Sequence, residues 1–136
     1  MTVILCLSEG GGMLFNKRRQ SRDRKVISDV VAMLEGRPLN ITDFSKKYLS
    51  ENGIDTRAWD DPLKECGADD FVFVENMRLC PYAKKIKRLV IYKWNTVYPT
   101  DFRIDVEPEK LNMKLLSSID FEGYSHDKIT REIWER

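Results

Sequence analysis

Histidine is almost absent from this sequence, since His126 is the only one among 136 residues. Hydrolytic metal sites need several imidazole ligands, and neither an HxHxDH nor an HExxH motif occurs. A Ser-His-Asp or Cys-His catalytic arrangement could use only His126, and no GxSxG motif accompanies it. We therefore interpret His126 as a surface-turn residue of the segment Tyr124-Ser-His-Asp127, and we predict no metal site.

Cysteine and long apolar runs are scarce too. Cys6, Cys66 and Cys80 are odd in number, and none has the CxxC spacing of a metal site. We interpret them as reduced, mostly buried thiols, which indicates a cytoplasmic protein. No apolar run approaches the roughly 20 residues of a membrane span, and the N-terminal segment lacks the features of a signal peptide. We expect no membrane partner.

An excess of charge of either sign is also absent. The chain has 23 basic and 22 acidic residues, and its net charge of +1 argues against a dedicated polyanion binder. Its 136 residues suit one domain, 1–136, that buries roughly two-thirds of the surface of the unfolded chain. No repeat or linker divides the sequence, so we expect a single globular domain.

The sequence does contain alternating short apolar runs and amphipathic segments. Strands are expected at residues 2–7, 38–42, 71–74 and 89–94, of which the first and third read as buried. Helices are expected from Ser21, as the cap, to Gly36, at 43–50, after the acidic cap at 60–62, and at about 78–87. Two longer strands at 113–119 and 128–135 follow. This order predicts an α/β fold with a mainly parallel central sheet, flanking helices and a C-terminal antiparallel β-hairpin.

The first quarter of the chain has the strongest functional signal. The opening strand leads into Ser8-Glu-Gly-Gly-Gly-Met13, in which Gly10, Gly11 and Gly12 can take φ > 0 or approach a ligand closely. Open α/β sheets bind ligands at the carboxyl ends of their strands. We therefore interpret the segment as a flexible loop over a small-molecule pocket, with a surface turn that binds no ligand as the alternative.

A basic stretch follows this loop, and Asp23 is its only acid. Its cations form a candidate surface for phosphates or an acidic partner: Lys17, Arg18, Arg19, Arg22, Arg24 and Lys25. The alternative is a solvated loop and helix face. Asp23 either stabilises the helix start beside these arginines or acts as a proton-relay carboxylate, for which burial would have to raise its pKa.

Several segments, taken in order, resemble those of the dihydrofolate reductase family. Residues 61–74 resemble its short helix, turn and buried strand, residues 87–95 its next strand, and residues 121–136 its closing hairpin. Residues 3–13 resemble its first strand and the loop that folds over the nicotinamide. The similarity runs thinly over nearly the whole chain and implies a dihydrofolate reductase-like fold. It also implies a catalytic role for Asp23, which best matches the family's acid near the start of the first helix.

The chain departs from that family where the cofactor binds. Glu75-Asn76 stands in place of a diglycine after the buried strand, and Asp43 lies near the phosphate loop, where it would repel a phosphate. Residues 51–60 are too few for the strand pair that holds the adenosine half of the cofactor. We infer that ordinary nicotinamide-dinucleotide binding has been lost, and we expect no cofactor.

Three hypotheses follow. In the first, the chain is a diverged dihydrofolate reductase-like protein without standard NADPH-dependent activity that keeps a pocket for a small anionic or heteroaromatic ligand. That pocket would be lined by Leu7, Gly10, Gly11, Gly12, Met13, Asp23, Ile27 and Tyr92. In the second, the chain is an active reductase of dihydrofolate or a related pterin, with NADPH as its cofactor and Asp23 assisting protonation.

The third hypothesis is an RNA-associated or interaction protein that uses the basic residues 17–25. No RRM, KH or helix-turn-helix signature accompanies them. Small bacterial proteins that resemble this chain can carry a ribonuclease Z label. Because the HxHxDH cluster is missing, zinc-dependent tRNA cleavage by this chain is chemically implausible.

Overall fold

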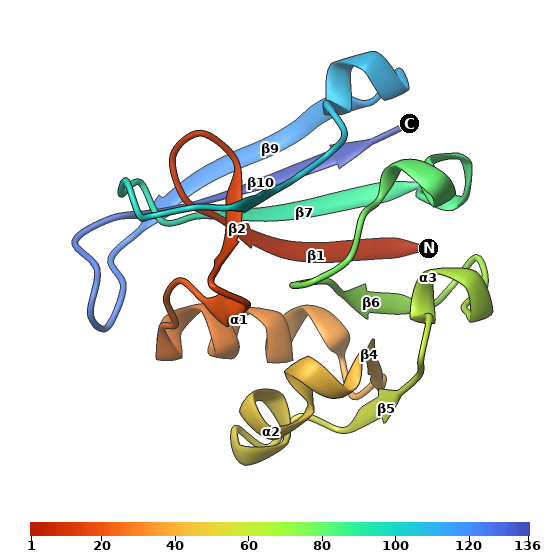
Figure 1. The fold of residues 1–136 in the computed structure, drawn as a ribbon, viewed down its shortest axis with the longest axis horizontal. Coiled ribbons are helices and arrows are strands. Elements are labelled where there is room, and N and C mark those ends of the chain that lie inside the picture. The colour runs from red at the N-terminus through yellow and green to blue at the C-terminus, as the bar shows by residue number, and fades with distance from the viewer.

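Ten strands form two sheets in the computed structural model, which describes residues 1–136 (Figure 1). The larger sheet contains β1 (Thr2–Leu7), β4 (Leu39–Ile41), β5 (Thr56–Ala58), β6 (Phe71–Phe73), β7 (Arg88–Lys93), β9 (Lys114–Phe121) and β10 (Ile129–Glu135). The smaller sheet contains β2 (Gly12–Phe15), β3 (Arg18–Arg19) and β8 (Phe102–Arg103). The α-helices are α1 (Arg24–Leu34), α2 (Asp43–Glu51) and α3 (Pro62–Glu65), and the 3₁₀ helices are η1 (Cys80–Lys85) and η2 (Pro108–Leu111).

The larger sheet is mainly parallel. Its strand order is β5-β4-β6-β1-β7-β10-β9, and every neighbouring pair from β5 to β7 is parallel. β10 pairs antiparallel with both β7 and β9, so the last two strands form a hairpin at one edge of the sheet. The predicted α/β class, the mainly parallel sheet and the antiparallel C-terminal hairpin are confirmed.

The two faces of this sheet bury different parts of the chain. Along β1, Val3, Leu5 and Leu7 point to one face and Ile4 to the other, because side chains alternate along a strand. α1 and α2 cover the Ile4 face, on one side of the sheet in Figure 1. α3, the residues around η1 and the segment 104–113 cover the opposite face. The sheet therefore separates two hydrophobic cores.

α1 begins shortly after β3 and packs one face against the larger sheet. Its buried residues are Val26, Ile27, Val30 and Leu34. The cap of the helix is Asp23, whose side chain accepts a hydrogen bond from the backbone N–H of Lys25 at 2.8 Å. The prediction that Ser21 caps this helix is therefore wrong, because the carboxylate two residues later reaches the free N–H groups.

Four short strands are absent from the sequence prediction: β2, β3, β5 and β8. β2 and β3 form a hairpin through a two-residue turn at Asn16 and Lys17, whose φ angles of 51° and 60° are left-handed. β8 pairs with the other edge of β2. The start of the basic stretch is thus the turn and second strand of a hairpin rather than an irregular loop. Strands of two to four residues are too short to produce a recognisable alternation of polar and apolar residues.

The remaining helical segments are short. Residues 78–87, expected to be helical, form only the six-residue 3₁₀ helix η1, within which Tyr82 has non-helical φ and ψ angles of −117° and 15°. Pro81 also removes a backbone N–H from this segment. None of the helices combines the length and apolar composition needed to cross a membrane.

A matched pair of leucine substitutions tests the position of the core. Leu5 in β1 is 0% exposed, and Leu116 in β9 is 56% exposed. We expect Leu5→Ala to lower the free energy of unfolding by about 2–5 kcal/mol, because it leaves a cavity between packed side chains. We expect Leu116→Ala to cost less than about 1 kcal/mol. Urea denaturation measures both values, and equal losses would contradict the position of β1 in the core.

Candidate functional site

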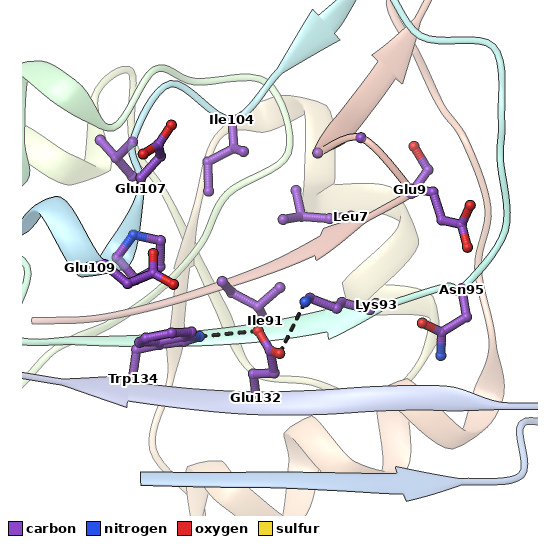
Figure 2. A pocket seen from close by; sticks show the side chains of 15 residues that line it. Leu7, Glu9, Ile91, Lys93, Asn95, Ile104, Glu107, Glu109, Glu132 and Trp134 are labelled. Carbon is purple, nitrogen blue, oxygen red and sulfur yellow. Dashed lines mark hydrogen bonds and ion pairs between the residues drawn. The ribbon is translucent and has the colours of Figure 1, made fainter. Parts of the chain in front are cut away.

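A groove lies on the sheet face that α1 and α2 leave free, and it has a cavity volume of about 460 Å³. Its walls come from the turn after β1, from β7 and β10, and from the segment that contains residues 104–109 (Figure 2). The lining residues are Leu7, Ser8, Glu9, Gly10, Gly11, Ile91, Lys93, Asn95, Ile104, Val106, Glu107, Pro108, Glu109, Glu132 and Trp134. Four separate parts of the chain therefore meet around this groove, which we call the glutamate groove.

Strand alternation builds the floor of the glutamate groove. Ile91 and Lys93 are two residues apart on β7, and Glu132 and Trp134 are two residues apart on β10, so each pair shares a face of the sheet. Glu132 lies opposite Ile91 in the antiparallel register. Leu7, at the end of β1, completes an apolar floor with Ile91 and the indole of Trp134, as Figure 2 shows.

The glycine turn forms one wall of the groove. Gly10 and Gly11 have φ angles of 81° and 78°, which only glycine adopts without strain. The N–H of Gly11 donates to the carbonyl of Ser8 at 3.1 Å, and the carbonyl of Gly11 accepts from the N–H of Ile104 at 3.0 Å. The turn is thus hydrogen-bonded to the wall formed by residues 104–109, and it is not a free loop above the groove.

Carboxylates dominate the polar lining. Glu107 and Glu109 lie at the Trp134 end of the groove, and Glu9 lies at the other end (Figure 2). Glu132 forms an ion pair with Lys93 at 3.0 Å and accepts a hydrogen bond from the Trp134 indole at 3.1 Å. Glu107 pairs with Lys110 at 3.1 Å. Glu9 and Glu109 have no basic partner, so the groove has an excess of negative charge.

The structure does not bring the predicted pocket residues into one cavity. Leu7, Gly10 and Gly11 line the glutamate groove. Gly12 lies against the side chains of Ser8, Thr100 and Gln20, and Met13 is buried in the core on the same face as Leu7. Asp23 and Ile27 border a separate depression beside α1. Tyr92 is fully buried on the α1 face, where its hydroxyl donates to Asp29 at 2.6 Å.

Protein side chains fill the region between β6 and the start of α1. Arg19 Nη2 donates to Glu75 Oε1 at 2.7 Å, and the buried Ser45 hydroxyl donates to the same oxygen at 2.7 Å. The guanidinium of Arg19 lies 4.1 Å from the centre of the Tyr48 ring. The cavity beside this cluster measures only about 10 Å³, which is near the minimum needed for one water molecule.

Asp23 is held as a carboxylate rather than poised as an acid. Its Oδ1 accepts from the N–H groups of Lys25 and Tyr124, both at 2.8 Å. Its Oδ2 accepts from the N–H and hydroxyl of Ser125, at 2.9 and 3.2 Å, and lies 2.8 Å from His126 Nδ1. Burial alone would raise the pKa of Asp23, but these hydrogen bonds outweigh it and hold the pKa well below its usual range. A proton-donating role needs the opposite shift.

His126 is not the free surface residue that its local sequence indicates. Its side chain is 8% exposed, and its ring stacks on that of Trp94 with the centroids 4.7 Å apart. Nε2 lies 2.9 Å from Ser21 Oγ and 3.2 Å from the hydroxyl of Tyr98. Ser21 and His126 are 105 positions apart in sequence, so no local motif could have indicated that they meet.

The predicted anion-binding residues remain on the surface, with one exception. Lys17, Arg18, Arg22, Arg24 and Lys25 are exposed, and we call them the basic surface. Arg19 is the exception, because it is partly buried and pairs with Glu75. A shallow depression of about 510 Å³ is lined by Lys17, Arg18, Arg19, Gln20, Ser21, Arg22 and Phe44. No acidic side chain lines it, so it has a positive charge, and we call it the basic depression.

No group of three or more His, Cys, Asp or Glu side chains is arranged to hold a metal ion. The three cysteines are free: Cys66 is buried, Cys6 is partly buried and Cys80 is exposed. No protein-family model matches this chain, and no curated protein matches it. The chemistry of the groove, of the Asp23 cluster and of the basic surface is therefore the basis for a functional assignment.

Replacing Asp23 tests the role of its carboxylate. We expect Asp23→Ala to lower the free energy of unfolding by about 2–4 kcal/mol at neutral pH, because it removes a helix cap and leaves buried donors unpaired. The folded-state pKa lies below the unfolded value of about 3.9. The stabilisation is therefore present above that value and is lost as the pH falls below it. Urea denaturation at a series of pH values measures this.

Asp127→Ala is the matched control, because Asp127 is an exposed acid in the same turn. We expect this variant to change the free energy of unfolding by less than about 0.5 kcal/mol. If the wild type and Asp23→Ala differed by the same amount at neutral pH and at about pH 3, the carboxylate would not be the source of the stability.

Proposed function

We propose that this chain is a diverged protein with a dihydrofolate reductase-like fold that binds a small cationic ligand in the glutamate groove. In this proposal it does not perform standard NADPH-dependent reduction. The observation that carries the proposal is the combination of an apolar floor with carboxylates at both ends of one groove. Concave sites of this size with an apolar lining and a few converging polar groups are typical ligand sites.

The dihydrofolate reductase-like fold is supported by the order of the elements. A mainly parallel sheet with a closing antiparallel hairpin is the arrangement that the resemblance implies. Divergence from that family is supported by residues 51–60, which hold the single short strand β5 where the family has a strand pair. A nicotinamide cofactor would therefore find fewer strands against which to place its adenosine half.

Loss of reductase chemistry is supported by two features around α1. The cavity of about 10 Å³ beside the Arg19–Glu75 pair is far too small for a pterin ring. The lowered pKa of Asp23 is unsuited to an acid that assists protonation near neutral pH. The active-reductase alternative would require both the ion pair and the Asp23 cluster to rearrange.

The charge of the groove favours a cation over the anionic ligand of the sequence hypothesis. Glu9 and Glu109 have no basic partner, and a ligand amine or amidine could bind either carboxylate through charge-assisted hydrogen bonds. The indole of Trp134 offers a π-face for a flat or cationic group. We therefore expect a ligand with an apolar, planar body and at least one positive charge.

Three isosteric probes test this charge preference. Benzamidinium, benzamide and benzoate share a phenyl ring and are positive, neutral and negative at neutral pH. We expect benzamidinium alone to bind measurably and to quench tryptophan fluorescence, because only it complements the carboxylates. Glu9→Gln and Glu109→Gln should each weaken its affinity by about two- to fivefold, the usual value of an exposed ion pair.

Glu122→Gln is the matched control, since Glu122 is an exposed acid in the closing hairpin and does not line the groove. Its affinity for benzamidinium should equal that of the wild type. Equal binding of benzoate and benzamidinium, or unchanged affinity in both groove variants, would rule out a cation site in the glutamate groove.

The reductase alternative makes a different prediction. We expect no protein-dependent loss of NADPH absorbance on adding dihydrofolate, and no rise in the melting temperature with NADPH, because a ligand of the folded state would stabilise it. A dihydrofolate reductase added to the same mixture is the positive control. Protein-dependent NADPH oxidation would overturn the proposed loss of activity.

The RNA-associated alternative has narrower support. The basic surface is exposed and would attract a phosphate backbone. Such attraction is independent of nucleotide sequence and falls steeply with salt. The hypothesis stays a prediction, and binding of a short RNA that is lost on reversing the charge of Lys17 and Arg18 would favour it.

A further inference from the structure

Ser21, His126 and Asp23 are joined by hydrogen bonds in the order found in serine hydrolases. We propose that Ser21 and His126 form a hydrolytic site for esters with a negatively charged acyl group, with Asp23 as the positioning residue. This activity is separate from ligand binding in the glutamate groove, and neither proposal depends on the other.

The distances place each atom where nucleophilic catalysis needs it. His126 Nδ1 lies 2.8 Å from Asp23 Oδ2, and His126 Nε2 lies 2.9 Å from Ser21 Oγ. An ionised carboxylate can only accept hydrogen bonds, so Nδ1 carries the ring proton of the neutral imidazole. Nε2 is then free to accept the proton of the Ser21 hydroxyl, which is the role of a general base.

The surroundings hold the imidazole in this orientation. Asp23 accepts five hydrogen bonds, and four of them come from groups other than the His126 ring. Gly123 makes this turn possible, because a Cβ atom there would lie 2.7 Å from Asp23 Oδ2. The Trp94 ring stacks on the imidazole with an interplanar angle of 24°. Asp23 therefore holds one edge of the His126 ring and Trp94 covers one face before any substrate binds.

Tyr98 adds a further contact at the nucleophile. Its hydroxyl lies 3.4 Å from Ser21 Oγ, to which it can donate, and 3.2 Å from His126 Nε2. When the Tyr98 hydroxyl donates to Ser21 Oγ, the hydroxyl proton of Ser21 points toward His126 Nε2. The three side chains thus form one network at the edge of the basic depression.

In this proposal the basic depression binds the negatively charged acyl group of the substrate. Ser21 lines it together with the exposed cations Lys17, Arg18 and Arg22. A carboxylate on the acyl part of an ester would bind these cations, and Phe44 offers an apolar surface for the rest of that group. The backbone N–H groups of Ser21 and Arg22 donate to no backbone carbonyl, and in this proposal they bind the developing oxyanion.

The reaction is an ordinary two-step ester hydrolysis. Ser21 Oγ attacks the ester carbon while His126 Nε2 takes the hydroxyl proton, and the carbonyl π electrons move to oxygen. The C–O bond to the alcohol then breaks, and Nε2 returns the proton to the departing oxygen. Water, deprotonated by Nε2, attacks the acyl-serine, releases the acid and restores the Ser21 hydroxyl. Ester and water give acid and alcohol, with no other reactant.

Covalent labelling tests the nucleophile. A fluorophosphonate reagent reacts with an activated serine and leaves a mass increase that peptide mass spectrometry assigns to a residue. We expect labelling of Ser21 in the folded wild type, none in Ser21→Ala, and unchanged labelling in Ser28→Ala. Ser28 is a suitable control because it is an exposed serine whose hydroxyl only donates to the Arg24 carbonyl. Melting temperatures show that each variant is folded.

A substrate pair tests the charge preference. The probes are a fluorogenic coumarin ester of terephthalate, which keeps a free carboxylate, and the same coumarin ester of benzoate. We expect faster hydrolysis of the terephthalate ester, and Arg22→Gln should lower the ratio of the terephthalate rate to the benzoate rate. Lys114→Gln, an exposed lysine on β9, is the control and should leave both rates unchanged.

Variants of the other two residues separate catalysis from structure. Asp23→Asn should lower kcat by about 10²-fold or more with little change in KM, because the amide can stabilise the wrong tautomer of His126. His126→Gln should abolish labelling. Wild-type protein that labels Ser21 no faster than Ser28, or Ser21→Ala that hydrolyses the esters at the wild-type rate, would overturn the proposal.

Discussion

The Asp23 carboxylate is the interaction that joins the start of α1 to the turn carrying His126, and the candidate hydrolytic site depends on it. It caps α1 through Lys25 N–H and, through Tyr124 and Ser125, holds a turn that is 101 to 103 positions away in sequence. The same turn places His126 between Trp94 and the carboxylate. The pKa of Asp23 stays low because of these donors, so the group is a fixed negative charge. A fixed charge orients a neighbouring imidazole, whereas it cannot supply a proton.

The net charge of +1 conceals two surfaces of opposite sign. The glutamate groove lies on one face of the central sheet and has carboxylates at both ends. The basic surface lies at the small sheet and the start of α1, where Arg19 alone is neutralised by Glu75. The fold therefore has one surface with an excess of negative charge and another with an excess of positive charge. Overall composition could not separate these two surfaces.

The sequence predicted β1, β6 and β7 because these central strands are mostly buried and read as continuous apolar runs. It could not predict the position of Tyr92 relative to Leu7. In the parallel register Tyr92 lies beside Cys6 and Lys93 lies beside Leu7, so Tyr92 and Leu7 point to opposite faces. The glycines did indicate one wall of the groove. The other walls come from segments distant in sequence, and nothing local indicated that Glu107 and Glu109 would face the glycine turn.

Ligand binding in the glutamate groove, without NADPH binding, is tested most directly by two-dimensional NMR titration of the folded protein. With benzamidinium, the largest shifts should occur at the Gly10 and Gly11 amides and the Trp134 indole N–H, all of which belong to groove residues. NADPH should leave the amides of Asp43 and Asn76, which lie where the family binds the cofactor, unshifted. Benzamidinium shifts spread over unrelated surfaces, or NADPH shifts concentrated at Asp43 and Asn76, would contradict the proposed function.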